Sequence, residues 1–257
     1  MEYILICIVA FLVAILTFFS GFGLGTILTP VFMLFFPVEL AIALTGVVHF
    51  FNNVFKIFLV GRKADKGVLL RFGIPAVIFS FIGAWVLLRI PDAQPLFEYE
   101  MFGKTFFVFP VKFVISMLLL IFASWDLIPY FQRLQFGKDK LPIGGMLSGF
   151  FGGLSGNQGA LRSAFLIKAG LTKEAFIGTA VVVSTFVDFT RLSVYATRMD
   201  QSGLTDNLVL VISATLSAVA GAYLGLKLLK KVTLKFLQIT VAIMLILLSL
   251  ALGAGLL

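Results

Sequence analysis

Six segments of this chain are apolar over about 20 residues, the length at which an α-helix crosses the hydrocarbon core of a bilayer. They are residues 38–60, 67–90, 105–131, 173–195, 205–226 and 232–257. Hydrophobic residues make up 60% of the chain and charged residues 12%, about half the charged share of an ordinary soluble domain. A water-soluble globule could not cover so much apolar surface. The pattern predicts an all-α integral membrane protein.

Two further apolar regions, 3–36 and 142–170, are each interrupted by a short glycine-rich polar segment. The interruptions are residues 20–25 and residues 155–159. Irregular backbone cannot face lipid because its N–H and C=O groups would lack hydrogen-bond partners, so each break must be buried or line a cavity. We therefore expect each region to be a re-entrant or broken helical hairpin with two half-length arms. Glu2 replaces the basic start of a leader peptide, so residues 1–19 are expected to be mature structure.

The two broken regions occupy equivalent places in two halves of the chain. Aligning residues 20–56 with 155–191, a shift of 135 positions, gives seven identities in 37 positions and also superposes polar residues. Asn53 falls on Asp188, and Lys56 falls on Arg191. We expect residues 1–131 and 141–257 to be two repeats of one integral membrane domain.

Loop charges predict that these repeats have opposite orientations. Loops 61–67, 132–141 and 226–235 are basic, whereas the loop 91–104 carries three acidic residues against one lysine. Basic loops stay in the cytoplasm, which places the first three on that side and both termini outside. Each hairpin must then enter and leave on one side. Three crossings remain per half, so the second repeat is inverted, as in many secondary transporters with a substrate site at the repeat interface.

The hairpin tips are the first candidate substrate site. A half-helix that begins near Gly25 or Gly159 presents unpaired N–H groups and the positive end of its dipole, which favour an anion. Arg162 follows in the first turn of the second of these half-helices. The candidate substrate contacts at the tips are Gly23, Gly25, Asn157, Gln158, Gly159 and Arg162. Two alternatives stay open: the glycines only allow close helix packing, or Arg162 is a structural partner of Asp188 or of a carbonyl.

Polar side chains also form a stripe along two of the apolar segments. In residues 38–60 the stripe is Thr45, His49, Asn52, Asn53 and Lys56, and in residues 173–195 it is Ser184, Asp188, Arg191 and Tyr195. Spacings of three and four residues place each set on one side of a helix. We expect both stripes to face the interior. Their candidate substrate contacts are His49, Asn52, Asn53, Ser184 and Asp188.

The cationic ends of the stripes are candidates for gates on an anion path. A two-fold axis in the membrane plane would place Lys56 toward the cytoplasm and Arg191 toward the exterior. Asp188, deep in the membrane, is a candidate proton carrier. The structural alternatives are that both cations snorkel to the interface, that Arg191 only neutralises Asp188, and that His49 only packs.

Several function classes find little support in the sequence. The basic residues lie in short loops without a continuous stripe, so nucleic acid is not an expected partner. The single cysteine, Cys7, gives no disulfide framework, and neither a phosphate-binding loop nor a metal-ligand cluster is present, so no metal and no cofactor are expected. Residues 153–156 match the Gly-x-Ser-Gly pattern of intramembrane serine proteases, but the only histidine, His49, precedes that serine instead of following it. An anion channel and an intramembrane serine hydrolase remain as alternatives to a carrier.

Residues 21–30, 148–166 and 187–192 resemble the two repeats of the TauE/SafE sulfite exporter family, also called the toluenesulfonate uptake permeases. The resemblance covers nearly the whole chain. It implies a multi-pass carrier in a bacterial cell membrane for a small anion such as sulfite, a sulfonate or sulfoacetate, with lipid and a coupling proton or ion as further partners. The tips depart from the family's glycine triplet, which leaves the substrate open, and the oligomeric state is open too.

Overall fold

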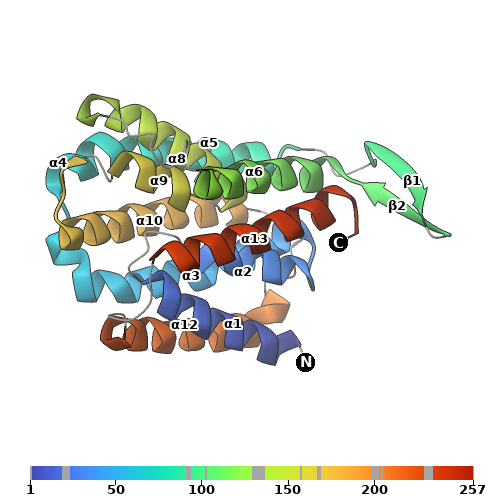
Figure 1. The fold of residues 1–257 in the computed structure, drawn as a ribbon, viewed down its shortest axis with the longest axis horizontal. Helices are drawn as coiled ribbons and strands as arrows, with labels where there is room; N and C mark the ends of the chain where they lie inside the picture. The colour runs from blue at the N-terminus through green and yellow to red at the C-terminus, as the bar shows by residue number, and fades with distance from the viewer. Residues whose placement is uncertain are drawn as a thin grey trace.

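The computed structural model describes residues 2–18, 24–90, 94–101, 103–128, 137–156, 158–166, 169–197, 203, 205–228 and 234–256. Almost all of these residues are helical, and the long helices run side by side along the longest axis of the molecule (Figure 1). The first half contains α1 (Glu2–Thr17), α2 (Leu24–Met33), α3 (Val38–Val60), α4 (Lys66–Val68), the π-helix η2 (Leu69–Gly73), α5 (Ile74–Leu87) and α6 (Pro110–Leu127). The second contains α8 (Leu141–Ser155), α9 (Gly159–Leu166), α10 (Lys173–Ala196), α12 (Leu208–Leu228) and α13 (Leu234–Gly253). The short 3₁₀ turns are η1 (Gly61–Lys63), η3 (Lys138–Lys140) and η5 (Thr205–Asn207).

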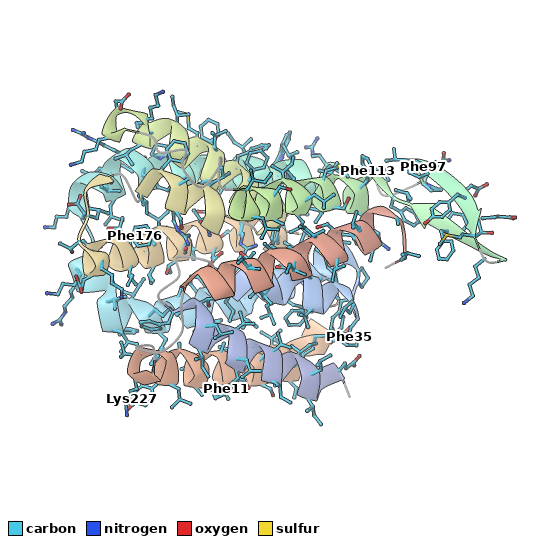
Figure 2. The ribbon with its side chains drawn as sticks, in the orientation of Figure 1. Phe11, Phe35, Phe97, Phe113, Phe176 and Lys227 are labelled. Carbon is cyan, nitrogen blue, oxygen red and sulfur yellow. The ribbon has the colours of Figure 1, made fainter. Side chains whose placement is uncertain are left out.

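The outside of this bundle suits lipid. Within the described residues, four helical segments are long and apolar enough to cross a membrane: Leu40–Lys63, Lys66–Leu87, Lys173–Tyr195 and Leu208–Lys227. Bulky apolar side chains point outward on several helices, among them Phe58, which is 80% exposed, and Leu216, which is 65% exposed. Phe35, which is 38% exposed, lies at the edge of the bundle in Figure 2. Such a surface is stable in hydrocarbon and not in water.

Each broken region contains two helices that pack against each other, and these two arms are unequal in length. The first arms, α1 and α8, have 16 and 15 residues, and the second arms, α2 and α9, have 10 and 8. At 1.5 Å per residue, a first arm is about 24 Å long, most of a hydrocarbon core of about 30 Å. The prediction of half-length arms therefore agrees with the second arms, α2 and α9, and not with the first arms. Arm α8 ends where Gly156 adopts φ +77°, a conformation that glycine takes without strain.

The described residues also include a β-hairpin, which the all-α prediction omitted. Strands β1 (Phe97–Met101) and β2 (Lys104–Val108) pair antiparallel and project past the end of the bundle (Figure 1). The predicted crossing at 105–131 is therefore wrong at its start, because the helix begins only at Pro110. A short apolar run such as residues 105–108 does not distinguish strand from helix by periodicity. Tyr99 ties the hairpin to the bundle by donating a hydrogen bond to the Ala254 carbonyl at 2.6 Å.

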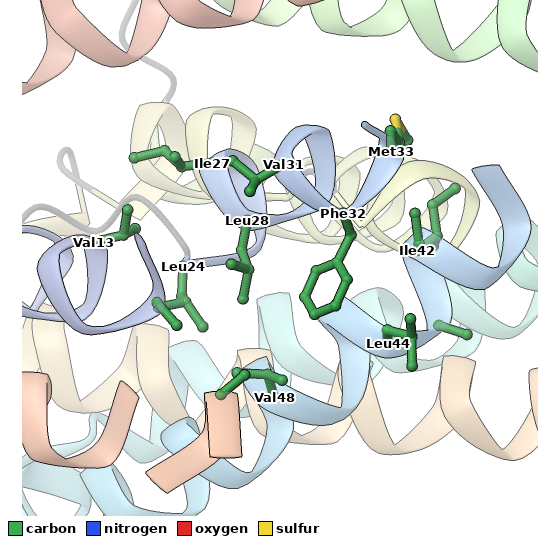
Figure 3. Packing of buried hydrophobic residues seen from close by; sticks show 14 of the residues in the cluster. Val13, Leu24, Ile27, Leu28, Val31, Phe32, Met33, Ile42, Leu44 and Val48 are labelled. Atoms are coloured by element: carbon green, nitrogen blue, oxygen red, sulfur yellow. The ribbon is translucent and has the colours of Figure 1, made fainter. Parts of the chain in front are cut away.

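Each of the main helix pairs joins one helix of the first half to one helix of the second half. Helix α3 packs on α10 and α6 on α13, while α5 packs on α8 and α1 on α12. At two of these interfaces glycine lets the backbones meet: a Cβ at Gly149 would overlap the backbone of Ala76, and a Cβ at Gly221 would overlap the backbone of Phe11. Short arms fill the interior. Leu24, Leu28 and Phe32 of α2 extend toward α3 in Figure 3, and every residue of α2 is buried.

Candidate functional site

The polar stripes of α3 and α10 face each other in the centre of the bundle. All nine predicted stripe residues are buried, the most exposed being Tyr195 at 8%. The two stripes meet at Asp188, which is fully buried. Its Oδ2 lies 2.6 Å from His49 Nδ1 and accepts a hydrogen bond from Asn53 Nδ2 at 3.4 Å. The prediction that both stripes face inward is confirmed.

The other oxygen of Asp188 binds Arg191. Asp188 Oδ1 lies 3.0 Å from Arg191 Nε and 2.9 Å from Arg191 Nη2, so two guanidinium nitrogens meet one oxygen. The predicted ion pair within α10 is therefore present. The remaining nitrogen, Arg191 Nη1, points toward Gly156, where a Cβ would lie 2.8 Å from it. Arg191 thus extends from the central carboxylate to the end of α8 at Gly156.

A cavity of about 20 Å³ lies beside the histidine, enough for about one water molecule. Its polar lining comes from α1, α3, α9 and α10. The lining includes His49, Asn53, Lys56, Arg162 and Ser184, together with Thr17, Phe18 and three apolar residues of α10. Arg162 Nη1 donates a hydrogen bond to Ser184 Oγ across this space. Five of the predicted site residues therefore line one small cavity.

Lys56 is held at the cavity wall by neutral partners. Its Nζ lies 5.3 Å from the centre of the Phe18 ring. With its amide oxygen and nitrogen exchanged, Asn52 satisfies both atoms. The oxygen accepts from Lys56 Nζ at 3.3 Å, and the nitrogen donates to the Ala218 carbonyl of α12 at 3.2 Å. Asn52 therefore positions Lys56 against α12 and is absent from the cavity lining among the described residues. Lys56 is 4% exposed, so it does not snorkel to the membrane surface.

The hairpin tips lie next to the stripes. A Cβ at Gly25 would lie 3.5 Å from the Gly156 carbonyl oxygen and 3.9 Å from His49 Cγ, so the start of α2 approaches the end of α8 and the central histidine. Helix α9 begins at Gly159, preceded by Gln158, whose side chain is 3% exposed. Neither amide atom of Gln158 has a hydrogen-bond partner within the described part of the chain. Gly23 and Asn157, the other predicted tip contacts, lie outside the described residues.

Three residues near the site were not predicted. Thr17 and Phe18 line the cavity from the end of α1, and Thr29 of α2 approaches the Gly156 turn, with its Oγ1 3.8 Å from where a Cβ would lie. Thr29 belongs to an apolar helix and carries no periodic signal. Thr17 lies three residues before the predicted break, a position that could have marked it.

The described residues hold no group of three His, Cys, Asp or Glu side chains that could bind a metal ion.

With this geometry in place, sequence comparison assigns the chain to a family. The profile of the family described as sulfite exporter TauE/SafE matches residues 6–252, nearly the full length. The chain belongs to the TauE/SafE family. It is therefore a transmembrane transporter, and the resemblance predicted from its sequence motifs is confirmed. Comparisons with curated proteins and with solved structures gave no match.

Proposed function

We propose that this TauE/SafE protein is a secondary carrier of a small sulfur-containing anion such as sulfite, a sulfonate or sulfoacetate. The observation that carries the proposal is the charge around the cavity. Among the described side chains, those that are buried and charged are Lys56, Arg162 and Arg191 against the single carboxylate of Asp188. An excess of buried positive charge is costly unless an anion compensates it. The site therefore favours an anionic substrate over a cation or a neutral solute.

The substrate binds between the hairpin tips and the inner faces of α3 and α10 in this proposal. Arg162, in the first turn of α9, presents a planar donor fork that suits two oxygens of a sulfite or sulfonate group. The start of α9 adds the positive end of a helix dipole. Gln158, buried at that start with an amide that lacks a described partner, supplies a further donor. Together they match a small oxoanion better than an apolar solute.

The helix pairs support an inverted repeat. If α1, α2, α3, α5 and α6 correspond to α8, α9, α10, α12 and α13, the pair α5·α8 exchanges with α12·α1, and α5·α10 exchanges with α12·α3. The pairs α3·α10 and α6·α13 map onto themselves. A two-fold relation produces such a set of pairs. We propose that residues 1–131 and 141–257 are the two repeats, each a re-entrant hairpin followed by three crossings.

The proposed topology keeps the basic loops in the cytoplasm of a bacterial cell, with the chain in its inner membrane. Helix α4 and the end of α12 near Lys227 lie at one end of the bundle, whereas the β-hairpin and both termini lie at the other (Figures 1 and 2). This arrangement agrees with cytoplasmic loops at 61–67 and 226–235 and with termini outside. Cysteines at residues 63 and 227 should both react with reagents from the cytoplasmic side alone. Labelling from opposite sides would disprove the topology.

The cavity is smaller than the proposed substrate. A space for about one water molecule is too small for a sulfite ion, so the site must widen to bind one. A carrier must open and close such a site once per cycle. For the alternative of a serine hydrolase, His49 Nδ1 is engaged with Asp188, and Ser155 Oγ donates to the Phe151 carbonyl at 2.9 Å. The His49–Asp188 contact is of the kind that orients a catalytic histidine, but the contact of Ser155 with a backbone carbonyl supplies no base to activate the serine.

Flux measurements on the purified chain in proteoliposomes test the proposal. Radiolabelled sulfite, sulfoacetate, taurine and sulfate would be offered in parallel, with protein-free liposomes as the baseline. We expect saturable exchange of at least one sulfur-containing anion. The other anions should inhibit this exchange more strongly the better they fit the site. Transport of none of them would overturn the proposal. Single-channel currents would favour the channel, and product formation lost in Ser155→Ala would favour the hydrolase.

A further inference from the structure

Asp188 separates the cavity from Arg191. Its Oδ2 faces His49 and its Oδ1 faces Arg191, at 2.6 Å and 2.9 Å respectively. His49 belongs to the cavity lining, whereas Asp188 and Arg191 do not, among the residues described. The carboxylate is fully buried, and the cavity-lining residues that contact it are His49 and Asn53, of which the histidine can carry a proton. A negative charge thus lies between the cavity and the third buried cation.

That charge obstructs an anion. A substrate moving from the cavity to Arg191 would approach a carboxylate of the same sign, and two like charges repel strongly where water is excluded. Arg191 would also have to release Asp188 before it could bind the substrate. Neutralising the carboxylate removes both obstacles.

The histidine provides a route for the neutralising proton. His49 is the only histidine of the chain, and its two ring nitrogens allow a proton to arrive at one as another leaves from the other. Asn53 Nδ2 lies 3.3 Å from both ring nitrogens and holds the ring beside the carboxylate. The distance of 2.6 Å between Nδ1 and Oδ2 is short enough for the proton to cross directly.

We propose that His49 and Asp188 form the proton-coupling site of the carrier. In this step, which rests on the proposed function, a proton from the cavity binds Nε2 of His49. The Nδ1–H bond breaks and an Oδ2–H bond forms, which leaves a neutral imidazole and a neutral carboxylic acid. Arg191 then exchanges the carboxylate for the substrate anion. A proton and a monovalent anion enter together, so the buried charge is the same before and after loading.

The surrounding groups leave Asp188 as the proton acceptor. The other charged or titratable groups that face the pair are Lys56 from α3, Arg162 from α9, and Arg191 and Tyr195 from α10. Tyr195 donates its hydroxyl to the Gly153 carbonyl, away from the carboxylate. The helices α2 and α8 carry no ionisable side chain. From α1 the site receives Thr17 and Phe18, and from α12 the carbonyl of Ala218. Among the described groups, Asp188 is the single carboxylic acid. The four basic groups around it are His49, Lys56, Arg162 and Arg191.

Two transport modes separate coupling from binding. Radiolabelled sulfite exchange would be measured at equal pH on both sides of proteoliposomes, and net accumulation would be driven by a pH gradient with the membrane potential clamped. Protein-free liposomes correct for passive entry of sulfite. We expect the wild type to show both modes. In Asp188→Asn the gradient-driven accumulation should fall to the protein-free level, a larger loss than the loss of exchange.

The controls keep each outcome interpretable. Asp206→Asn changes an exposed carboxylate outside the site and should accumulate sulfite like the wild type. If Asp188→Asn does not reach the membrane, His49→Gln makes the same test, because it removes the proton route while the Asp188–Arg191 pair remains. Normal gradient-driven accumulation by Asp188→Asn or His49→Gln overturns the proposal, as does wild-type exchange that no pH gradient drives. A wild type without any exchange contradicts the proposed function instead.

Discussion

Asn53 and Asp188 are 135 positions apart in the chain and in contact, with Asn53 Nδ2 3.4 Å from Asp188 Oδ2. The separation equals the shift that aligns the two halves of the sequence. Equivalent residues of two repeats can touch only near the axis that relates the repeats. The contact therefore supports an axis through the centre of the α3–α10 interface, where His49 and Asp188 also meet.

Substitution of Arg162 tests the anion site. Arg162→Lys keeps the charge but loses the planar fork that reaches Ser184, so we expect the KM for sulfite exchange to rise about tenfold or more, the worth of one charge-assisted hydrogen bond of about 1.5–3 kcal/mol. The measurement is the concentration dependence of exchange in proteoliposomes. Arg71→Lys, on an exposed side chain of η2, is the matched control. An unchanged KM in Arg162→Lys would remove the residue from the site.

Tyr195 should contribute to stability more than to transport. Its hydroxyl donates to the Gly153 carbonyl and so joins α10 to α8 near the hairpin turn. Tyr195→Phe leaves that buried carbonyl without this donor, and we expect a loss of about 1–3 kcal/mol in the free energy of unfolding. Thermal unfolding in detergent would show a lower Tm. Tyr223→Phe, at a side chain that is 45% exposed, should leave the Tm unchanged, and equal effects from both variants would contradict the expectation.

Glycines at different contacts should differ in their tolerance of alanine. A methyl group at Gly149 would overlap the backbone of Ala76, which cannot move without separating α5 from α8. We expect Gly149→Ala to cost about 1–3 kcal/mol, as overpacking of a close contact usually does. At Gly25 the nearest atom would be 3.5 Å away, an ordinary contact, so Gly25→Ala should be neutral for stability. The comparison uses Tm and membrane expression, and a destabilised Gly25→Ala beside a normal Gly149→Ala would reverse this interpretation.

The periodicity of the sequence predicted where single helices lie in the chain. It did not predict how the helices are rotated against one another. The predicted segment 38–60 coincides with α3 because Pro37 precedes the helix and Gly61 follows it. The partner of Arg162 could not be predicted in this way. It donates to Ser184, whereas the structural partners considered from the sequence were Asp188 and a carbonyl, and the choice depends on how α9 is rotated against α10. The β-hairpin was missed because its strands are too short for an alternating pattern to stand out.

Lys56 and Arg191 occupy equivalent positions when the two halves of the sequence are aligned, but replacing each with neutral glutamine should have different effects. Lys56 lines the cavity and its described partners are neutral groups, the Asn52 amide and the Phe18 ring. Lys56→Gln should therefore raise the KM for the anion. It should leave the Tm unchanged or higher, because it removes a buried charge and leaves no opposite charge unpaired among the described partners. Measurement of KM, maximal flux and Tm on one preparation separates these effects.

Arg191, in contrast, neutralises a carboxylate that has no exposure to water. Removing one partner of a buried ion pair costs about 3–5 kcal/mol, so Arg191→Gln should lower the Tm strongly as well as the flux. The double variant Arg191→Gln/Asp188→Asn removes both charges and should recover most of the Tm, but not the flux, since the anion still lacks its cation. If Lys56→Gln and Arg191→Gln both transport sulfite at the normal rate, the two residues are structural and the anion takes another path.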